Sequence, residues 1–507
     1  MKRDLDGILQ KTTLVYIVLP YLIFCLSWLK WPYAAVFGAI GFWVLYTSFK
    51  AVQSETSISQ LLFLSKKNLL YILVVLVVFM FFSGIGSYTF QNYDHLYRNA
   101  IFRDLVQKPW PVMYEIKGFG NHIFEGKTTF MTYYMGYFLP AAFIGKYLGF
   151  EAGKAALLIW SILGVCLVFL HIGRYLQRFN FKTLGLFLGW GTLFFVGALY
   201  KYPLREILEE KSWLWAGMVL YADSNIGMIY YTFNQGIMAW LILMLLMQNF
   251  NPRQIMFWYS LCFFLSPFAF VGMAPFVVYS VFKDYSKAKF LNYFSPENII
   301  GALSVLALTY MYLSNNEAGQ FFQMLHHRPK IFIVFLLLSW GIVAILLFPK
   351  YKKNALYWLI IAVLLPLPFF QQGYGIDFPG RLSIPALSIL MLLVGKTLIE
   401  TKSVWLKRGL IFYMLISGIG HVLLEPVRSV YFTGIEYWAR RGNVVSNFEK
   451  SENMILQYMA ADMRASLQQP NCIKDLGTLS NPKNEVIWNY MSDTETSRFY
   501  KYMAKKP

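Results

Sequence analysis

Residues 155–173 read AALLIWSILGVCLVFLHIG, a run without any Asp, Glu, Lys or Arg. About 20 apolar residues in a helix are enough to cross the hydrocarbon core of a bilayer. Similar runs recur along the chain, at residues 12–29, 31–49, 69–86, 183–200, 228–248, 297–314, 331–348, 355–370, 382–399 and 409–425. The pattern predicts an all-α polytopic membrane protein.

The overall composition excludes most other classes of protein. Of the 507 residues, 57% are hydrophobic and 14% are charged, and the mean hydropathy is +0.47. A soluble domain has about 25% charged residues, so this chain cannot cover a water-facing surface of its own size. The same numbers exclude a disordered chain. The four cysteines form no Cys-x-x-Cys pair and suggest no disulfide framework.

The basic residues indicate how the chain is oriented. The formal net charge is +19, and in a membrane protein such an excess marks cytoplasmic loops and lipid headgroups rather than nucleic acid. When the N-terminus is placed in the cytoplasm, every inner loop is basic. These loops contain Lys50, Lys66, Lys67, Arg174, Arg178, Lys182, Arg253, Lys283, Lys287, Lys289, Lys350, Lys352, Lys353, Lys402, Lys407 and Arg408. The agreement predicts about thirteen crossings and an extracytoplasmic C-terminus.

Two stretches affect the number of crossings. Residues 254–282 are too long for one span and contain Pro267 and Pro275, so we interpret them as a short hairpin with both ends on one side. Residues 130–148 are also apolar, but counting them as a span would place the basic segment 174–182 outside. We therefore expect 130–148 to form an interfacial or re-entrant helix at the outer face, where its tyrosines suit the headgroup level.

This topology divides the chain into two parts. Residues 1–425 form the transmembrane domain, whose first large outer loop covers residues 87–154. Residues 426–507 are polar enough to form a small extracytoplasmic domain. Within this tail we expect a helix at 447–467 and a turn at 477–482.

An acidic residue stands close to the membrane at the start of the first outer loop. Asp94 follows the span 69–86 closely, His95 adjoins it, and Arg98 is one helical turn further on. Ionisable groups in such places are functional candidates, and a carboxylate there is able to serve as a general base. The alternative is an Asp94–Arg98 ion pair that only caps the loop. Both interpretations remain open from the sequence.

A second polar cluster lies between two spans on the outer side, at residues 371–381, which read QQGYGIDFPGR. Arg381 begins the next helix. A guanidinium binds phosphate with two parallel hydrogen bonds, and the backbone N–H groups at a helix start also favour an anion. The alternatives are a structural Asp377–Arg381 pair and ordinary turn chemistry at the glycines.

Three weaker candidates complete the set. His326, His327 and Arg328 lie on an outer loop and are able to hold a pyrophosphate or an anionic lipid, although a solvated basic rim is the favoured interpretation. The adjacent histidines do not indicate a metal, because neighbours on a helix point apart. Asp223 is a second possible acid on the outer side. The amides at 234–235 lie within a span, and we favour a structural role for them over a sugar pocket.

The first outer loop resembles that of the GT-C superfamily of polytopic membrane glycosyltransferases. Asn92-Tyr93-Asp94-His95 occupies the place of that family's acidic residue near the start of the loop. Residues 133–140 (YYMGYFLP) and 145–149 (GKYLG) are similar to its interfacial helix and closing glycine turn. The similarity covers residues 69–182. The chain departs from the family in having two spans before the expected first one and no Asp-x-Asp or Glu-x-Asp pair at Asp94.

The resemblance implies an inverting glycosyltransferase at the outer face of a bacterial plasma membrane. The donor would be a polyprenyl-phosphate-linked sugar and the acceptor a glycan or lipid-linked molecule of the cell envelope. Asp94 would deprotonate the acceptor hydroxyl, and Arg381, assisted by the basic residues 326–328, would stabilise the leaving phosphate. His95, Arg98 and Asp377 would help to bind the donor. We expect membrane lipids as partners, no nucleic acid and no cofactor, while a divalent metal is left open.

Other classes of function remain as alternatives. A polysaccharide polymerase or ligase also acts on lipid-linked glycans. A transporter or flippase should carry charged residues in the middle of spans and show repeated halves. The sequence has no internal repeat, and within its spans His171 and Lys396 lie near the inner ends. A membrane scaffold without enzymatic activity is a further alternative.

Overall fold

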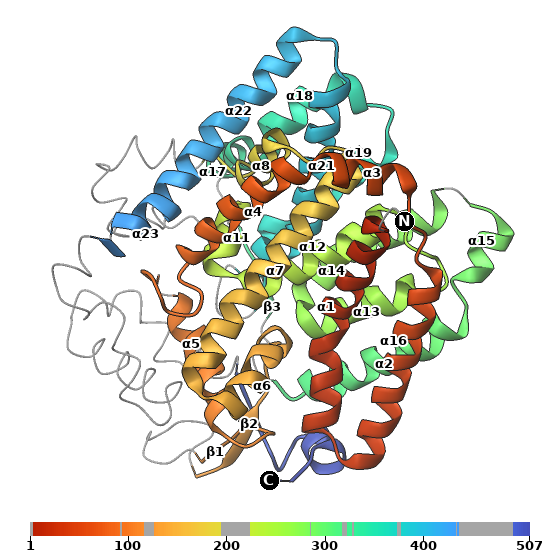
Figure 1. Ribbon diagram of the computed structural model, residues 1–507, viewed down its shortest axis with the longest axis vertical. Helices are drawn as coiled ribbons and strands as arrows, with labels where there is room; N and C mark the ends of the chain where they lie inside the picture. Colours follow the sequence, from red (N-terminus) through yellow and green to blue (C-terminus); the bar gives the residue numbers. More distant parts are fainter. Residues whose placement is uncertain are drawn as a thin grey trace.

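A computed structural model describes residues 4–91, 94–115, 126–193, 224–283, 285–316, 322–326, 329–372, 377–431, 433–434 and 490–506. The fold is mostly helical (Figure 1). The helix and turn that we expected at 447–467 and 477–482 lie outside the described residues.

The helices follow the apolar runs of the sequence. In chain order they are α1 (Leu5–Trp28), α2 (Trp31–Ala51), α3 (Thr56–Leu64), α4 (Lys66–Phe81), α5 (Asp94–Gln107), α6 (Leu139–Leu148), α7 (Phe150–Leu176), α8 (Phe181–Leu188), α11 (Asn225–Tyr231), α12 (Phe233–Met247), α13 (Ile255–Leu265), α14 (Pro267–Phe282), α15 (Lys287–Asn292), α16 (Pro296–Leu313), α17 (Pro329–Leu336), α18 (Ile342–Tyr351), α19 (Ala355–Leu364), α20 (Asp377–Leu382), α21 (Ile384–Glu400), α22 (Val404–Val422) and α23 (Arg428–Tyr431). Short 3₁₀ or π turns are η1 (Met135–Phe138), η3 (Leu337–Gly341), η4 (Leu367–Phe369), η5 (Leu423–Val427) and η10 (Phe499–Met503).

The protein is a polytopic helical membrane protein. Within the described residues, five helical stretches are long and apolar enough to cross a membrane: α1, α2, α7, residues Pro329–Tyr351 and residues Val404–Tyr431. The pair α3–α4, bent by 73°, is a possible sixth span. Four shorter apolar helices are Phe233–Met247, Ile255–Leu265, Pro267–Phe282 and Ala355–Phe369. Large apolar side chains stand exposed along the spans, including Phe42 and Val78, and this surface suits lipid rather than water.

The described parts of the two terminal regions lie at opposite ends of α1. The helix begins where the Asp4 side chain accepts a hydrogen bond from the backbone N–H of Gly7. At its other end, the backbone N–H of Lys505 donates to the carbonyl of Trp28 over 2.8 Å. A helix of 24 residues is about 36 Å long, which exceeds the thickness of a hydrocarbon core. In Figure 1 the start of α1 and the dark-blue segment at the described C-terminal end accordingly lie far apart.

Two small sheets add to the helices that the sequence predicted. Strands β1 (Met113–Glu115), β2 (Thr128–Met131) and β5 (Met491–Asp493) form an antiparallel sheet in that order. Strands β3 (Phe322–Met324) and β4 (Phe370–Gln372) form a second, two-stranded sheet. The expectation of an all-α fold missed them because three or four residues are too few to show an alternating pattern, and β5 comes from the far end of the chain.

The segment 130–148 does not form a full crossing. It consists of the end of β2, the turn η1 and the ten-residue helix α6. Ten helical residues span about 15 Å, roughly half of the hydrocarbon thickness. The helix ends at Gly149, whose φ of 93° favours glycine, and α7 starts directly after it.

The segment 254–282 forms the expected hairpin. Helix α13 ends before Ser266 and α14 begins at Pro267. The rings of Tyr259 and Phe270 stack with centroids 4.4 Å apart, and the Tyr259 hydroxyl donates to the Phe270 carbonyl over 2.9 Å. In a straight helix these two residues would be about 16 Å apart, so the chain reverses at Ser266.

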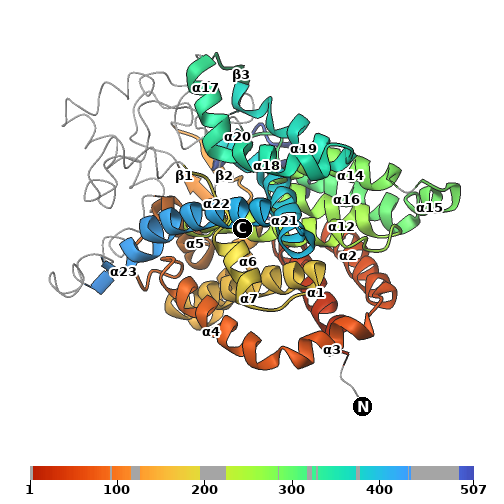
Figure 2. The ribbon, with the colours of Figure 1, turned by 90° about the horizontal axis from the view of Figure 1, so that it is seen from above.

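In Figure 2, α3 and α4 lie on one side of the molecule and α17 with β3 on the opposite side.

Candidate functional site

The carboxylate of Asp94 is partly accessible to solvent. Asp94 is the first residue of α5, and 39% of its side chain is exposed. Arg98 lies one turn later, with its Nη2 atom 3.4 Å from Asp94 Oδ2, and its Nη1 donates to the Asp94 carbonyl over 2.6 Å. The ion pair that the spacing predicted is therefore present, and Asp94 still reaches solvent.

Arg98 connects this carboxylate to the buried start of α12. Its own side chain is only 10% exposed, and its Nε donates to Asn234 Oδ1 over 3.4 Å. The neighbouring Gln235 donates through Nε2 to the hydroxyl of Tyr134 over 2.9 Å. Among the described residues, the Asn234 Nδ2 and Gln235 Oε1 atoms are buried without a hydrogen-bond partner. The two amides thus offer one hydrogen-bond donor, Asn234 Nδ2, and one acceptor, Gln235 Oε1, beside Arg98.

His95 is buried and holds α5 against α11. Its Nε2 lies 2.9 Å from the Tyr230 carbonyl, and its ring is stacked on Phe233 with the centroids 5.9 Å apart. Burial, with a smaller effect of the Arg98 charge, lowers the pKa of His95 to about 3. The imidazole is consequently neutral near pH 7 and carries no positive charge toward a phosphate.

Arg381 approaches the same helix junction from another direction. The expectation that Arg381 begins a helix is wrong: it lies in the last turn of α20, so the N–H groups at the start of that helix are not beside it. Only 3% of its surface is exposed, and its Nη1 is 3.8 Å from the sulfur of Met228 on α11. Helix α20 packs closely on α14, since a Cβ atom at Gly272 would lie 2.0 Å from the carbonyl oxygen of Leu382. Asp377 begins α20, and its side chain is outside the described part of the structure.

A third buried arginine, which the sequence analysis missed, reaches this junction as well. Arg428 Nη2 donates to the hydroxyl of Tyr231 and to Glu425 Oε2, both over 3.0 Å, and Tyr231 in turn donates to Glu425 Oε1. Both Glu425 and Arg428 are 1% exposed. Glu425 lies in the π turn η5, which follows α22, and Arg428 comes directly after that turn. The sequence did contain a signal for this ion pair, because two opposite charges stand three residues apart at the end of an apolar run.

Three arginines therefore meet the short segment from Met228 to Asn234, where α11 gives way to α12. Arg98 contacts Asn234, Arg381 contacts Met228 and Arg428 contacts Tyr231. Thr232 is the residue between the two helices. Two of these arginines are paired with a carboxylate, Arg98 with Asp94 and Arg428 with Glu425. Guanidinium groups around a helix break suit an anionic ligand.

The remaining predicted residues are not brought to this place by the described structure. His326 is exposed beside β3. His327, Arg328 and Asp223 lie outside the described residues. Asp104, a further acid on α5, is fully buried, and its Oδ2 accepts a hydrogen bond from the Tyr114 hydroxyl over 2.8 Å. Burial raises the pKa of Asp104 to about 6.

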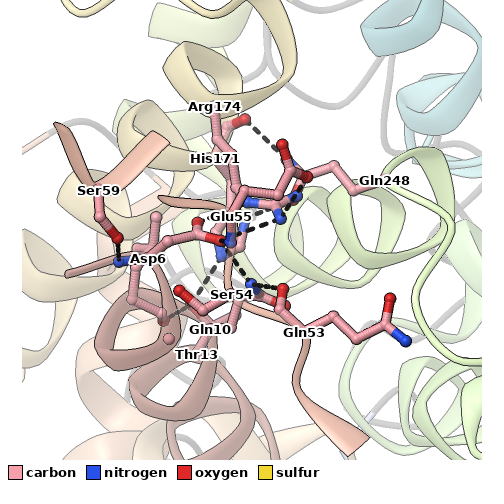
Figure 3. Close-up of polar contacts among 12 residues, drawn as sticks. Asp6, Gln10, Thr13, Gln53, Ser54, Glu55, Ser59, His171, Arg174 and Gln248 are labelled. Carbon is pink, nitrogen blue, oxygen red and sulfur yellow. Dashed lines mark hydrogen bonds and ion pairs between the residues drawn. The ribbon is translucent and has the colours of Figure 1, made fainter. Parts of the chain in front are cut away.

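Figure 3 shows a further set of polar contacts, centred on Asp6 at the start of α1 and Arg174 at the end of α7, which we call the inner cluster. Arg174 Nε donates to Asp6 Oδ1 over 2.7 Å, and its Nη2 contacts Glu55 Oε1 at 3.1 Å. Arg174 also donates to Gln248 Oε1 over 3.0 Å, which joins the ends of α7 and α12. His171 lies between Gln248 and a hydroxyl of α1, with ring nitrogens 3.0 Å and 2.8 Å from them.

The inner cluster has a structural role: it holds the ends of α1, α7 and α12 together, and it is not a ligand site. The Asp6 carboxylate also accepts from the backbone N–H of Glu55 over 2.9 Å and from Gln10 Nε2 over 3.0 Å. A buried ion pair with its remaining lone pairs satisfied holds its elements in one arrangement. The sequence analysis noted His171 and the basic Arg174 but not their partners, because Asp6 and Gln248 are far apart in the sequence.

The described residues contain no group of three or more His, Cys, Asp or Glu side chains arranged to hold a metal ion. Comparison of the chain with protein-family models, curated proteins and solved structures finds no match. The class that the fold defines is a polytopic helical membrane protein.

Proposed function

We propose that the protein is a glycosyltransferase that moves a sugar from a polyprenyl-phosphate donor to a cell-envelope acceptor at the outer face of a bacterial plasma membrane. In this proposal the chain crosses the membrane about thirteen times, with a cytoplasmic N-terminus. The observation that carries it is the solvent-accessible Asp94 carboxylate joined through Arg98 to the buried junction of α11 and α12. A polymerase or ligase of lipid-linked glycans is the alternative within the same chemistry.

The arrangement supports general-base chemistry at Asp94. The carboxylate takes the proton from an acceptor hydroxyl as its oxygen attacks the anomeric carbon of the donor. The bond from that carbon to the phosphate oxygen breaks on the opposite face, and the lipid phosphate leaves with the electron pair. Arg98 holds Asp94 in place through two contacts, one to the side chain and one to the backbone carbonyl.

The buried arginines supply positive charge for the leaving phosphate. Arg98 and Arg381 are almost fully enclosed, and charge interactions are stronger away from water. Fixed guanidinium groups aimed at a developing negative charge lower the barrier without reorganising during the reaction. Arg381 is the better candidate for direct contact, because it is almost fully enclosed at the junction, with its Nη1 3.8 Å from the Met228 sulfur.

The depth of the junction also supports an outer-face reaction. Helix α12 extends from Phe233, at the junction, to Met247, next to the inner cluster. Its 15 residues cover about 22 Å, against a hydrocarbon thickness of about 30 Å. With Met247 at the cytoplasmic edge of the hydrocarbon, as in the proposed orientation, the Arg98–Asn234 contact lies beyond the midplane, within reach of a phosphate of the outer leaflet.

The test is transfer of radiolabelled sugar by the purified protein from lipid extracts that contain polyprenyl-phosphate sugars. Lipids from a deletion strain should accumulate the donor and identify the sugar. Asp493→Asn, which changes a carboxylate on β5 paired with Lys127, is the matched control and should retain transfer. If lipid extracts support no transfer and the protein instead moves a solute across proteoliposomes, the transporter alternative replaces this proposal.

A further inference from the structure

The connection between α14 and α16 gathers aromatic rings at one edge of the molecule. We call residues 282–294, which include α15, the aromatic loop. The centroid of the Phe290 ring lies 6.1 Å from that of Phe282, 5.7 Å from that of Tyr285 and 5.2 Å from that of Phe294. These rings pack mainly on one another, and α15 stands apart from the other labelled helices in Figures 1 and 2.

Most of this aromatic surface is exposed. The exposed fractions are 58% for Phe282, 60% for Tyr285, 58% for Leu291 and 56% for Phe294. A contiguous apolar patch on a protein surface marks an interaction site, because water gains no hydrogen bonds from it. The partner must therefore offer an apolar layer to the loop.

The charges of the loop indicate that the partner is also anionic. Lys283 and Lys287 are exposed, and Lys289 is half-buried. The loop contains one acidic residue in its sequence, Asp284, so its formal charge is +2. Lysines that surround an apolar patch fit a surface on which negative charges stand above an apolar layer.

The loop lies at the end of the bundle that carries the inner cluster. It leads into α16, where Asn298 Nδ2 donates to the carbonyl of Pro252 over 2.6 Å and Ser295 Oγ donates to the carbonyl of Arg253 over 2.5 Å. Residues 252–253 directly follow the end of α12, where Gln248 binds Arg174. The aromatic loop is thus placed where the spanning helices enter the membrane, on the side of Asp6.

We propose that the aromatic loop is a binding element for anionic phospholipid, independent of the function proposed above. Its rings enter the leaflet at the level of the headgroups and the first acyl carbons, and Lys283 and Lys287 contact the lipid phosphates. Tyrosine suits this level because its ring is apolar and its hydroxyl is hydrated. A second copy of the chain and a soluble protein are the competing occupants of the surface.

The depth of the loop is measured with a spin label at Leu291→Cys in the full chain, with Cys472→Ser in the background, in nanodiscs with and without phosphatidylglycerol. A label at Lys353→Cys, on the exposed turn between α18 and α19, is the control. We expect the Leu291 label to be open to oxygen and protected from a water-soluble nickel chelate, while the Lys353 label is open to nickel. Access of nickel to the Leu291 label overturns the proposal. Protection from both reagents overturns it too, because it indicates protein contact.

The charge contribution is measured by the binding of radiolabelled phosphatidylglycerol in neutral mixed micelles. The double variant Lys283→Gln/Lys287→Gln should bind on the order of ten-fold more weakly than the wild type, since each lysine near an anionic surface contributes substantially. The control variant Lys352→Gln/Lys353→Gln removes two exposed positive charges from another basic loop, and it should bind phosphatidylglycerol like the wild type. An equal loss in both double variants means non-specific charge attraction and overturns the assignment to this loop.

Discussion

The Nε atom of Arg98 donates a hydrogen bond to Oδ1 of Asn234 over 3.4 Å, and this contact ties the start of α5 to the start of α12. The same guanidinium binds the Asp94 side chain at 3.4 Å and the Asp94 carbonyl at 2.6 Å. Arg98 is thus held by two groups that do not depend on the charge of Asp94. Removing that charge alone should leave the local structure intact, and this makes the role of Asp94 testable.

The first prediction is that Asp94→Asn abolishes sugar transfer while the protein stays folded and binds donor. Asparagine keeps the size of the side chain and an oxygen that accepts from Arg98, but it does not take a proton. General-base catalysis contributes about 10²–10⁴-fold, so transfer should fall by that order. The measurement is transfer of radiolabelled sugar in detergent beside a thermal melting curve.

Arg98→Ala distinguishes this role from a structural ion pair. If Asp94 only pairs with Arg98, both variants should lower the melting temperature and reduce transfer to a similar extent. Near-normal transfer by a well-folded Asp94→Asn protein would remove Asp94 from the mechanism, and Asp104 and Asp223 would be the next acids to test.

The second prediction concerns Arg381. Arg381→Ala should raise the Michaelis constant for the donor, and Arg381→Lys should restore binding only in part, because an ammonium cannot make two parallel hydrogen bonds to phosphate. Donor titrations of both variants give this constant, and their melting curves control for the loss of a buried side chain. An unchanged constant in a folded Arg381→Ala protein would favour the structural pair with Asp377.

The sequence predicted the membrane helices because their signal is local. A run such as 155–173 needs only its own composition to show a span, and Pro267 with the length of 254–282 was enough to predict the hairpin. The spacing of Asp94 and Arg98 similarly predicted their contact. Each of these features depends on residues close together in the chain.

The features that the sequence did not reveal depend on distant partners. Strand β5 pairs with β2 across most of the chain, and Asp6 meets Arg174 and Gln248 only after α1, α7 and α12 have packed. The Glu425–Arg428 pair was close in sequence, yet its importance comes from Tyr231 and from burial that only the packed helices produce. Single-sequence patterns carry no information about such long-range burial.

The third prediction is that Arg174→Ala strongly destabilises the protein. The substitution would leave the Asp6 carboxylate, which is 0% exposed, without its guanidinium partner. Breaking a buried ion pair on one side costs about 3–5 kcal/mol. The control is Lys350→Ala, which breaks a pair with the half-exposed Glu400 and should cost less than about 1 kcal/mol. Urea or thermal unfolding in detergent measures the loss of stability in both variants. Equal losses would contradict the structural role of the inner cluster.

The fourth prediction is that tags at the two ends of the chain lie on opposite sides of the membrane. Asp4 and Lys505 are next to opposite ends of α1, which is long enough to cross the bilayer. In intact spheroplasts, an added protease should remove a C-terminal tag and leave an N-terminal tag. Cleavage of the N-terminal tag with protection of the C-terminal one would reverse the orientation, and cleavage of both would contradict the crossing by α1.

Asp104 makes the stability of the protein depend on pH. Burial raises the pKa of this carboxyl from its ordinary value of 3.8 to about 6, and the hydrogen bond from Tyr114 opposes the change. The folded protein therefore holds this proton more tightly than the unfolded chain. Its stabilising contribution is complete below about pH 3.8 and is lost as the pH rises through about 6. The shift corresponds to about 3 kcal/mol.

The fifth prediction is that Asp104→Asn becomes more stable relative to the wild type as the pH rises from 4 to 8. Asparagine still accepts a hydrogen bond from Tyr114 but never ionises, so any cost of its buried NH₂ group is the same at each pH. The difference in unfolding free energy should change by about 2–3 kcal/mol, with most of the change between pH 4 and 6. Tyr114→Phe removes the hydrogen bond that opposes the pKa increase, so the pH-dependent loss of stability should extend to a higher pH in that variant. Melting curves at each pH measure both effects, and a difference between Asp104→Asn and wild type that stays constant from pH 4 to 8 would contradict the raised pKa.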